Sequence, residues 1–466
     1  MNTNSLWLIA GCCIYGLSSA APVQTSCEPQ YLTPDASASS FGRAVAMTDR
    51  HLLIGDWHDS RYCTIDPTCS NGMVYAYEKD ADGRWVLAQR VEPADLGPRF
   101  AYGAAVAVHE DWMVATAAGD GTGMGGHGAA YFFQHDGEQW VERQQVFNPS
   151  RFDFGYSAVL HGDIAVIQGG VGPTGGNGAI VYHFDSERWN QIEILESIDA
   201  VGEDAGFGYT LAIDDQRVVI GAQLESSTVT NGGAAYVFRR QPDGTLAFEQ
   251  KLIAPDVLEG PRLGTAVTIE GDTLVLGGML SDRPETAQGA AYAYRLIEGR
   301  WELVQEFTAE GSNERDRFGR AMALDGDRLV VTSMQGDTAA GPTGSAYVFA
   351  RGAGGLWAQV AELPPSTPEW VLEYGGAVAM RGNDVVVGAS YTMIDGDKRG
   401  AAHAFDLSCE ICPPDLDLDG SLTIYDFLTY LNLFQDGNPQ ADFDGDGELT
   451  IFDFLAFQDA FQAGCG

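Results

Sequence analysis

Two acidic loops near the C-terminus have the residue types and the spacing of calcium ligands. The sequences DLDLDGSLTIYD (415–426) and DFDGDGELTIFD (442–453) each place aspartates at positions 1, 3, 5 and 12, with a turn-permitting glycine at position 6. Oxygen ligands at this spacing wrap one calcium ion, together with the backbone carbonyl of position 7 and a water held by position 9. The predicted ligands for two calcium ions are Asp415, Asp417, Asp419, Ser421, Thr423 and Asp426 in the first loop, and Asp442, Asp444, Asp446, Glu448, Thr450 and Asp453 in the second.

A helix with an apolar stripe is expected after each loop. The large side chains that recur at helical spacing, and that would form a small shared core, are Phe427, Tyr430/Leu431, Phe434 and Phe454, Phe457, Phe461. No helix is expected before either loop, because CEICPP (409–414) and QDGNPQA (435–441) are turn-forming. Segment 409–466 contains twelve acidic residues and no Lys or Arg. Its carboxylates repel one another without metal, so the folding of this segment should depend on calcium.

The duplicated loop–helix unit resembles a dockerin, a calcium-folded module, over residues 412–465. The resemblance implies a protein partner for this helical domain, either a cohesin-like domain or another protein receptor. Dockerins of the best-known type present Ser-Thr at loop positions 10 and 11, where this chain has Ile424-Tyr425 and Ile451-Phe452. These four side chains are therefore the candidates for partner contact. A disulfide between Cys412 and Cys465 would staple the ends of a domain too small to hold itself by its core.

Seven sequence repeats precede the acidic module. Their opening phrase recurs as FGRAVAM (41–47), YGAAVAV (102–108), FGYSAVL (154–160), FGYTLAI (207–213), LGTAVTI (263–269), FGRAMAL (318–324) and YGGAVAM (374–380). Each phrase is followed by a polar turn, a β-branched run, a glycine-rich loop and a third strand, and in most copies by a fourth strand. Four short alternating strands per unit, in seven units, predict an all-β fold, a seven-bladed β-propeller of four-stranded blades.

The seventh repeat lacks its fourth strand, and the N-terminus supplies a candidate replacement. The sequence CEPQYLTPD (27–35) matches EQKLIAPD (249–256), which follows the fourth-strand pattern of another repeat. The N-terminal segment is therefore predicted to complete blade seven and close the ring, which removes the open sheet edge. Cys27 would then stand opposite Cys409 and form a disulfide. Cys63 and Cys69 lie in an insertion of the first repeat, and a second disulfide would clip that loop.

The seven phrases and their regular spacing resemble the FG-GAP repeats of the integrin α-subunit type of propeller, over residues 35–407. The resemblance implies the same seven-bladed fold. The glycine-rich loops before the third strands contain no Asp-x-Asp-x-Asp-Gly sequence, so the resemblance carries no calcium site into the propeller.

No catalytic motif is found in the sequence, and no catalytic residue is predicted. The eight histidines have no metal-ligand spacing, and no Gly-x-Ser-x-Gly sequence occurs. Asp56, His58 and Asp120 follow second strands, where a propeller could gather a dispersed active site. Solvated loop residues are the favoured interpretation of these three side chains.

The composition and the N-terminus indicate a secreted protein. A net charge of −39 argues against nucleic acid and against an anionic membrane surface as partners. Residues 1–21 have the apolar run and small residues of a signal peptide, with lipid attachment at Cys12 as a minor alternative, and no later stretch is apolar enough for a membrane span. The expected domains are the signal peptide (1–21), the propeller (22–408) and the calcium-binding, dockerin-like domain (409–466).

The favoured function is that of a secreted, non-catalytic binding or adhesion protein. The propeller would present loops to an unknown protein or glycan, and the calcium-folded module would anchor the chain to a protein partner on a cell surface or in an extracellular assembly. One alternative is a carbohydrate-active hydrolase or lyase that the dockerin-like module delivers. Another is a structural component of a surface layer.

Overall fold

The computed structural model describes residues 29–463 with short gaps. The gaps are 35–37, 59–71, 95–100, 119–127, 149–153, 172–175, 200–204, 227–228, 255–259, 282–286, 311–314, 335–336, 339–340, 343, 353, 366–370, 372, 411–415, 417–421, 423, 436–440, 442 and 444–448. The predicted signal peptide (1–21), Cys27, Cys63, Cys69, Cys412 and Cys465 lie outside the described residues, as does the side chain of Cys409. The three disulfides therefore stay predictions.

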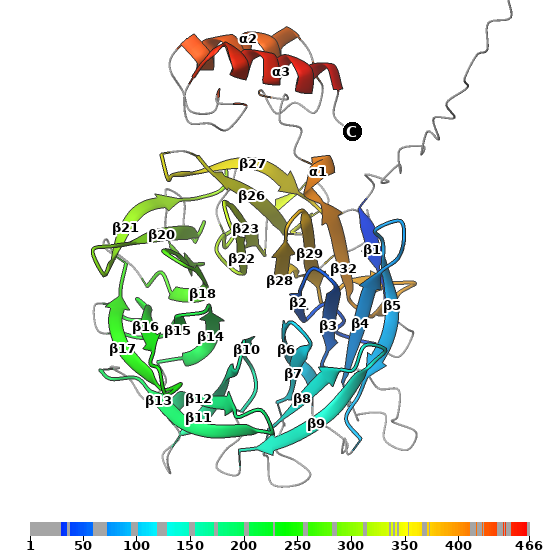
Figure 1. Cartoon of the computed structure of the whole chain (residues 1–466), viewed down its shortest axis with the longest axis vertical. Coiled ribbons are helices and arrows are strands. Elements are labelled where there is room, and N and C mark those ends of the chain that lie inside the picture. The colour runs from blue at the N-terminus through cyan, green and yellow to red at the C-terminus, as the bar shows by residue number, and fades with distance from the viewer. Residues whose placement is uncertain are drawn as a thin grey trace, which may run out of the picture.

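Seven four-stranded antiparallel sheets surround a central axis, which confirms the seven-bladed propeller (Figure 1). Blades one to three are β2 (Ala44–Met47), β3 (His51–Asp56), β4 (Met73–Lys79), β5 (Trp85–Val91); β6 (Tyr102–His109), β7 (Trp112–Ala117), β8 (Ala129–His135), β9 (Trp140–Phe147); and β10 (Ala158–His161), β11 (Ile164–Val171), β12 (Gly176–Phe184), β13 (Trp189–Glu196).

The same strand order continues around the ring. Blades four and five are β14 (Phe207–Ile213), β15 (Arg217–Ala222), β16 (Ala234–Arg240), β17 (Leu246–Leu252); and β18 (Leu263–Glu270), β19 (Thr273–Gly278), β20 (Ala290–Ile297), β21 (Arg300–Phe307). Blade six is β22 (Met322–Asp325), β23 (Arg328–Ser333), β26 (Ser345–Arg351) and β27 (Trp357–Leu363), and blade seven is β28 (Tyr374–Arg381), β29 (Asp384–Ala389), β32 (Ala401–Asp406) and β1 (Gln30–Leu32). Two small hairpins, β24 (Asp337–Thr338) with β25 (Gly341–Pro342) and β30 (Met393–Ile394) with β31 (Asp397–Lys398), extend from blades six and seven.

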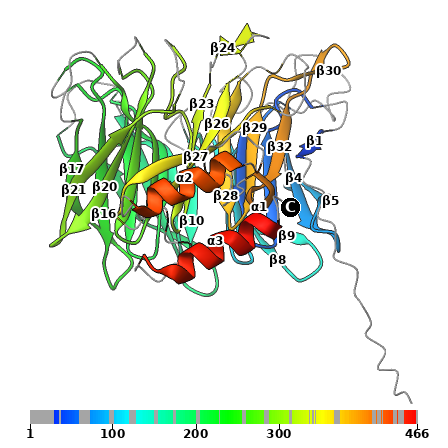
Figure 2. The same cartoon turned by 90° about the horizontal axis from the view of Figure 1, so that it is seen from above.

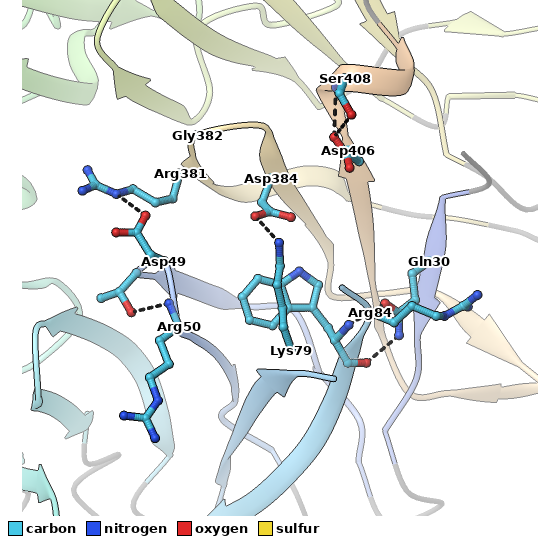
Figure 3. A network of polar contacts seen from close by, with 12 residues as sticks. Gln30, Asp49, Arg50, Lys79, Arg84, Arg381, Gly382, Asp384, Asp406 and Ser408 are labelled. Atoms are coloured by element: carbon cyan, nitrogen blue, oxygen red, sulfur yellow. Dashed lines mark hydrogen bonds and ion pairs between the residues drawn. The ribbon is translucent and has the colours of Figure 1, made fainter. Parts of the chain in front are cut away.

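The ring is closed by its N-terminal strand, as the repeat pattern predicts. Strand β1 pairs antiparallel with β32, so that Gln30 lies opposite Ala404 and Leu32 opposite Ala402. Ion pairs between blade seven and blade one reinforce the closure, with Lys79 bound to Asp384 and Arg381 bound to Asp49 (Figure 3). Strands from the two ends of the chain therefore form one blade.

A glutamine clamp recurs at the seams between blades. The side-chain amide of a glutamine in one fourth strand bonds both the N–H and the C=O of the tryptophan at or next to the start of the fourth strand of the next blade. The distances are 2.6–3.1 Å for the pairs Gln89–Trp140, Gln144–Trp189, Gln250–Trp301, Gln305–Trp357 and Gln30–Trp85. At one further seam Glu193 accepts only the N–H of Leu246. Gln30 thus takes the place in β1 that a fourth-strand glutamine takes in the other blades.

The core consists of apolar clusters that each join two neighbouring blades. Blades seven and one, for example, share Leu32, Phe41, Ile54 and Ala404, and the other seams have equivalent clusters. Neighbouring blades come close enough that the third-strand glycine of one faces the backbone of the next. A Cβ at Gly289 would lie 2.1 Å from the carbonyl oxygen of Phe318, and the φ of Gly289 is +88°.

Replacing Gly289 by alanine should therefore destabilise the propeller severely. A backbone clash and a positive φ add together, so we expect a loss of about 3–5 kcal/mol in the free energy of unfolding. Gly299 is the matched control, because its φ is +81° but a Cβ there meets nothing within 4 Å. Gly299→Ala should cost only about 1 kcal/mol. Urea denaturation of both variants measures the difference, and equal losses would contradict the close approach of blades.

The C-terminal segment forms helices at the predicted places. Besides the short α1 (Leu407–Glu410), α2 (Ile424–Gln435) and α3 (Ile451–Ala463) begin inside the two acidic loops. These two helices lie side by side in both views (Figures 1 and 2). The rings of Tyr430 and Phe457 stack at 4.1 Å between them, which confirms the small aromatic core. No helix in the described part of the chain is long and apolar enough to cross a membrane.

Candidate functional site

The first strands of all seven blades surround a central cavity of about 250 Å³. Alanine from the repeated phrase is the commonest residue in its wall, as at Ala44, Ala158 and Ala321. Small side chains there leave the channel open, because bulky residues on the innermost strands would fill it. The repeated phrase thus builds both the ring and the space at its centre.

The third residue of each phrase is the variable one, and it stands at this cavity. In blade order these residues are Arg43, Ala104, Tyr156, Tyr209, Thr265, Arg320 and Gly376, of which all but Gly376 line the cavity. We call these seven residues the variable ring. The glycine before each of them is constant, whereas the ring residue differs in size, charge and polarity. Such variation at a fixed position is typical of a binding surface on a repeat scaffold.

One side of the variable ring is cationic. Burial lowers the pKa of the Arg320 guanidinium, and Arg43 and Arg317 lower it further, while Glu373 opposes them. The guanidinium of Arg43 lies 4.9 Å from the ring centre of Trp57. Among the described residues, Arg43, Arg317 and Arg320 form no ion pair, although arginines elsewhere do, such as Arg217 with Glu249 at 2.7 Å. Arginines without an ion pair are notable in a chain of net charge −39.

The other side of the variable ring is aromatic. The rings of Tyr156 and Tyr209 lie nearly parallel, at an interplanar angle of 18° and with centres 6.5 Å apart. Tyr209 exposes 39% of its surface, although its blade is otherwise well packed. An exposed aromatic face offers an apolar platform beside the cationic side.

Two of the three residues considered for a dispersed active site, Asp56 and His58, are described, and the expectation of a solvated side chain is wrong for Asp56, which is fully buried. The buried carboxylate of Asp56 accepts the backbone N–H groups of Ser39, Ser40 and His58, so it holds the loop rather than the imidazole. His58 Nδ1 lies 3.1 Å from the hydroxyl of Ser40, which is buried. Burial lowers the pKa of His58, and Lys398 and Arg43 lower it further. Asp120 lies outside the described residues.

The acidic loops are described only in part. Asp415, Asp417, Asp419, Ser421, Thr423, Asp442, Asp444, Asp446 and Glu448 lie outside the described residues. The two aspartates at position 12 are described, and both are buried. Asp426 accepts the N–H of Leu416 at 2.8 Å, and Asp453 accepts the N–H of Phe443 at 2.8 Å. The same bond from position 12 to position 2 therefore closes both loops, and Asp453 also accepts the N–H of Thr450.

The candidates for partner contact lie at the surface where they are described. Ile424 and Ile451 are each 62% exposed and Phe452 is 64% exposed, whereas the side chain of Tyr425 is not described. Leu428 and Leu455 lie one turn further along α2 and α3 and are exposed as well. Each helix thus presents the same pair of apolar positions, in agreement with the sequence duplication.

Comparisons with known proteins support the repeat architecture. The FG-GAP repeat model matches residues 189–238, 247–294, 301–349 and 357–405. Each matched segment runs from the fourth strand of one blade through the third strand of the next. No curated protein sequence matches the chain.

Several solved structures are similar to this chain. A periplasmic gluconolactonase of Pseudomonas aeruginosa is 12% identical at a TM-score of 0.47, with 72% of this chain and 96% of that chain covered. A putative 6-phosphogluconolactonase of Bacteroides uniformis is 14% identical at 0.50, with 76% and 94% covered. A protein of Lactobacillus plantarum is 14% identical at 0.49, with 77% and 99% covered. Identities this low indicate nothing about the activity of this chain.

Proposed function

Because the chain is a seven-bladed β-propeller that carries FG-GAP repeats, we propose that it is an exported, non-catalytic binding protein. Its ligand is an acidic polysaccharide, held at the variable ring at the mouth of the central channel. Its C-terminal module folds around calcium and docks the chain to a protein partner, either a cohesin-like domain or another receptor. The variable ring is the observation that carries the proposal.

The cationic side of the ring supports an anionic ligand. Arg43 comes from blade one and Arg320 from blade six, and blade seven between them contributes only Gly376 to the ring. The missing side chain leaves room for a carboxylate to reach both guanidiniums. Arginine binds carboxylates through paired hydrogen bonds, which are stronger in a partly buried site than in water.

The aromatic side of the ring supports a sugar rather than an acidic peptide. The apolar face of a pyranose ring packs on an aromatic ring, and Tyr156 and Tyr209 present such faces across the channel from the arginines. A chain of uronic acid units offers both groups at once, a carboxylate and a flat ring. An acidic peptide would use the arginines alone.

Replacing the ring arginines should weaken the binding of uronic acid oligosaccharides. A hydrogen bond to a charged group is worth about 1.5–3 kcal/mol, so Arg43→Met or Arg320→Met should weaken binding by about 10- to 100-fold. Arg295→Met is the matched control, because Arg295 is paired with Asp272 outside the ring. Isothermal titration with acidic oligosaccharides, neutral oligosaccharides and poly-glutamate measures the affinities. Equal affinity of both ring variants and wild type for every ligand would exclude this site.

A carbohydrate-active enzyme at the same mouth is the second candidate, and His58 favours it. The lowered pKa of His58 keeps the imidazole neutral near pH 7, which suits a general base beside Arg43 and Lys398. A lyase needs a base and cations that neutralise the uronate carboxylate. Release of unsaturated or shortened products during the titration, lost in His58→Ala, would favour the enzyme over the binding protein.

The duplicated surface of α2 and α3 supports the docking role of the C-terminal module. Ile424 and Ile451 occupy equivalent places on the two helices, and both are exposed. Neighbouring exposed apolar side chains, such as Ile424 with Leu428 and Ile451 with Leu455, are expected at a protein contact site. A receptor can bind either helix in the same way, because the sequence is repeated.

A further inference from the structure

A second group of ligand-type side chains lies at the seam between blades one and two, at the strand ends remote from the variable ring. His51 opens β3 and is paired with Glu78 near the end of β4. His135 is the last residue of β8, in the next blade. One potential ligand atom from each of the three residues lies within 4.8 Å of the others. None of the three contributes to the proposed polysaccharide site.

The spacing of these atoms suits metal ligands better than hydrogen bonds. His51 Nδ1 lies 3.4 Å from Glu78 Oε1, and His135 Nε2 lies 3.5 Å from the same oxygen. Hydrogen bonds between nitrogen and oxygen are shorter, about 2.7–3.2 Å. Two ligands bound tetrahedrally to zinc at about 2.0–2.1 Å lie about 3.3 Å apart.

His51 is a buried polar side chain that lacks a partner. It is 2% exposed, and neither of its ring nitrogens has a hydrogen-bond partner among the described residues. An unsatisfied buried polar group costs about 1–3 kcal/mol, so its retention calls for an explanation. Burial, and next the neighbouring His135, lower the pKa of His51 to about 4, so the imidazole is neutral and able to bind a metal at pH 7.

The surroundings hold both imidazoles in place. The indole of Trp140 contacts His51 and His135 with ring centres 5.0 and 5.2 Å away. Glu78 has a side chain that is one-third exposed, so solvent reaches the group from its side. Arg50 lies 3.9 Å from Glu78 and competes weakly for the carboxylate.

We propose that His51, Glu78 and His135 bind one zinc-type divalent ion, which links blade one to blade two. Two imidazoles and one carboxylate form a donor set that zinc prefers and that calcium does not. The exposed side of Glu78 leaves a fourth position for water. His135 Nδ1 accepts the N–H of Gly137 at 3.2 Å, so binding at Nε2 moves the ring proton to Nδ1 and shifts the exposed turn that contains Gly137.

Metal titration of the full-length protein tests the site. Calcium is kept in excess so that the C-terminal carboxylates are occupied, and Zn²⁺ is followed by calorimetry and Co²⁺ by its absorption spectrum. We expect one zinc equivalent and a tetrahedral cobalt spectrum in the wild type. His51→Ala, His135→Ala and the isosteric Glu78→Gln should each lower the zinc affinity by at least about 100-fold. This loss is larger than the usual loss from replacing a residue that only orients a ligand. Zinc should also raise the Tm of the wild type but not the Tm of these three variants.

His161→Ala is the matched control, because His161 contacts an aspartate, Asp215, at 2.8 Å across a different seam. This variant should keep the zinc equivalent and the cobalt spectrum. Circular dichroism verifies that each variant is folded. If a histidine variant does not fold, the zinc affinity of Glu78→Gln tests the site. The proposal is overturned if the folded Glu78→Gln chain binds zinc like the wild type, or if the wild type binds no zinc beyond the C-terminal module.

Discussion

A chain that lacks residues 1–34 should lose its stable propeller, because blade seven then has only three strands. Strand β32 would expose the edge that β1 covers, and the cluster around Leu32 and Phe41 would open to water. Stability in a ring depends on every seam, so one open seam weakens the whole. We expect a loss of more than about 5 kcal/mol, which is most of the stability of a typical domain. Thermal unfolding and size-exclusion chromatography of the truncated chain measure it.

A point variant in β1 distinguishes the effect of ring closure from the effect of shortening the chain. Gln30→Leu removes both hydrogen bonds to Trp85 without shortening β1, and it should cost about 2–3 kcal/mol because buried backbone groups lose their partners. Gln305→Leu at a closed seam is the matched control and should cost about the same. A synthetic peptide of residues 22–37 should restore stability to the truncated chain. If the truncated chain melts like the wild type, β1 does not close the ring.

Removal of calcium should unfold the C-terminal module while the propeller stays folded. Asp426 and Asp453 are buried at the ends of the two acidic loops, and buried carboxylates need a cation or hydrogen bonds to offset desolvation. Helices α2 and α3 hold only a small shared core, so metal binding and folding should be one transition. Helical circular dichroism should fall on chelation and return when calcium alone is added back.

Tryptophan fluorescence distinguishes unfolding of the propeller from unfolding of the C-terminal module in the intact chain. No tryptophan occurs in 409–466, so the fluorescence reports on the propeller and should be unchanged by the chelator. Asp426→Asn and Asp453→Asn should each lower the calcium affinity by on the order of 10- to 100-fold or more. Asp459→Asn, on the exposed face of α3, should leave the calcium affinity unchanged. A helical circular dichroism signal that changes neither when chelator is added nor when calcium is added back would rule out a calcium-folded module.

The repeat pattern predicted the ring closure for a physical reason. Sequence repeats identify equivalent strands, whereas the exact equivalence of Gln30 and Gln250 comes from the register of the sheets. Gln30 lies opposite Ala404 and Gln250 opposite Val237, and each of these partners lies four residues after its third-strand glycine. Blade seven lacks a fourth strand, and the N-terminal segment has a strand pattern with no blade of its own. The pairing of β1 with β32 joins the two. The aromatic stripes of α2 and α3 were predictable in the same way, because helical spacing decides which side chains share a face.

The variable ring was not predicted, although its signal was present in the sequence. The third phrase position changes from Arg43 to Tyr156 to Gly376, while the glycine before it stays constant. Because successive side chains of a strand point to opposite faces of the sheet, the pattern shows that the third residue of every phrase lies on the same face. It does not show that this face borders the central channel, because that depends on how the blades pack around the axis.

The sequence by itself determined the number of blades, the closing strand and the duplicated C-terminal unit, since all three follow from repetition along the chain. Only the tertiary structure decided what meets across the seams. His51 and His135 lie far apart in the sequence and occur in different repeats, yet their rings are 4.7 Å apart. Contacts of this kind depend on the angle and distance between neighbouring blades, which no local spacing encodes.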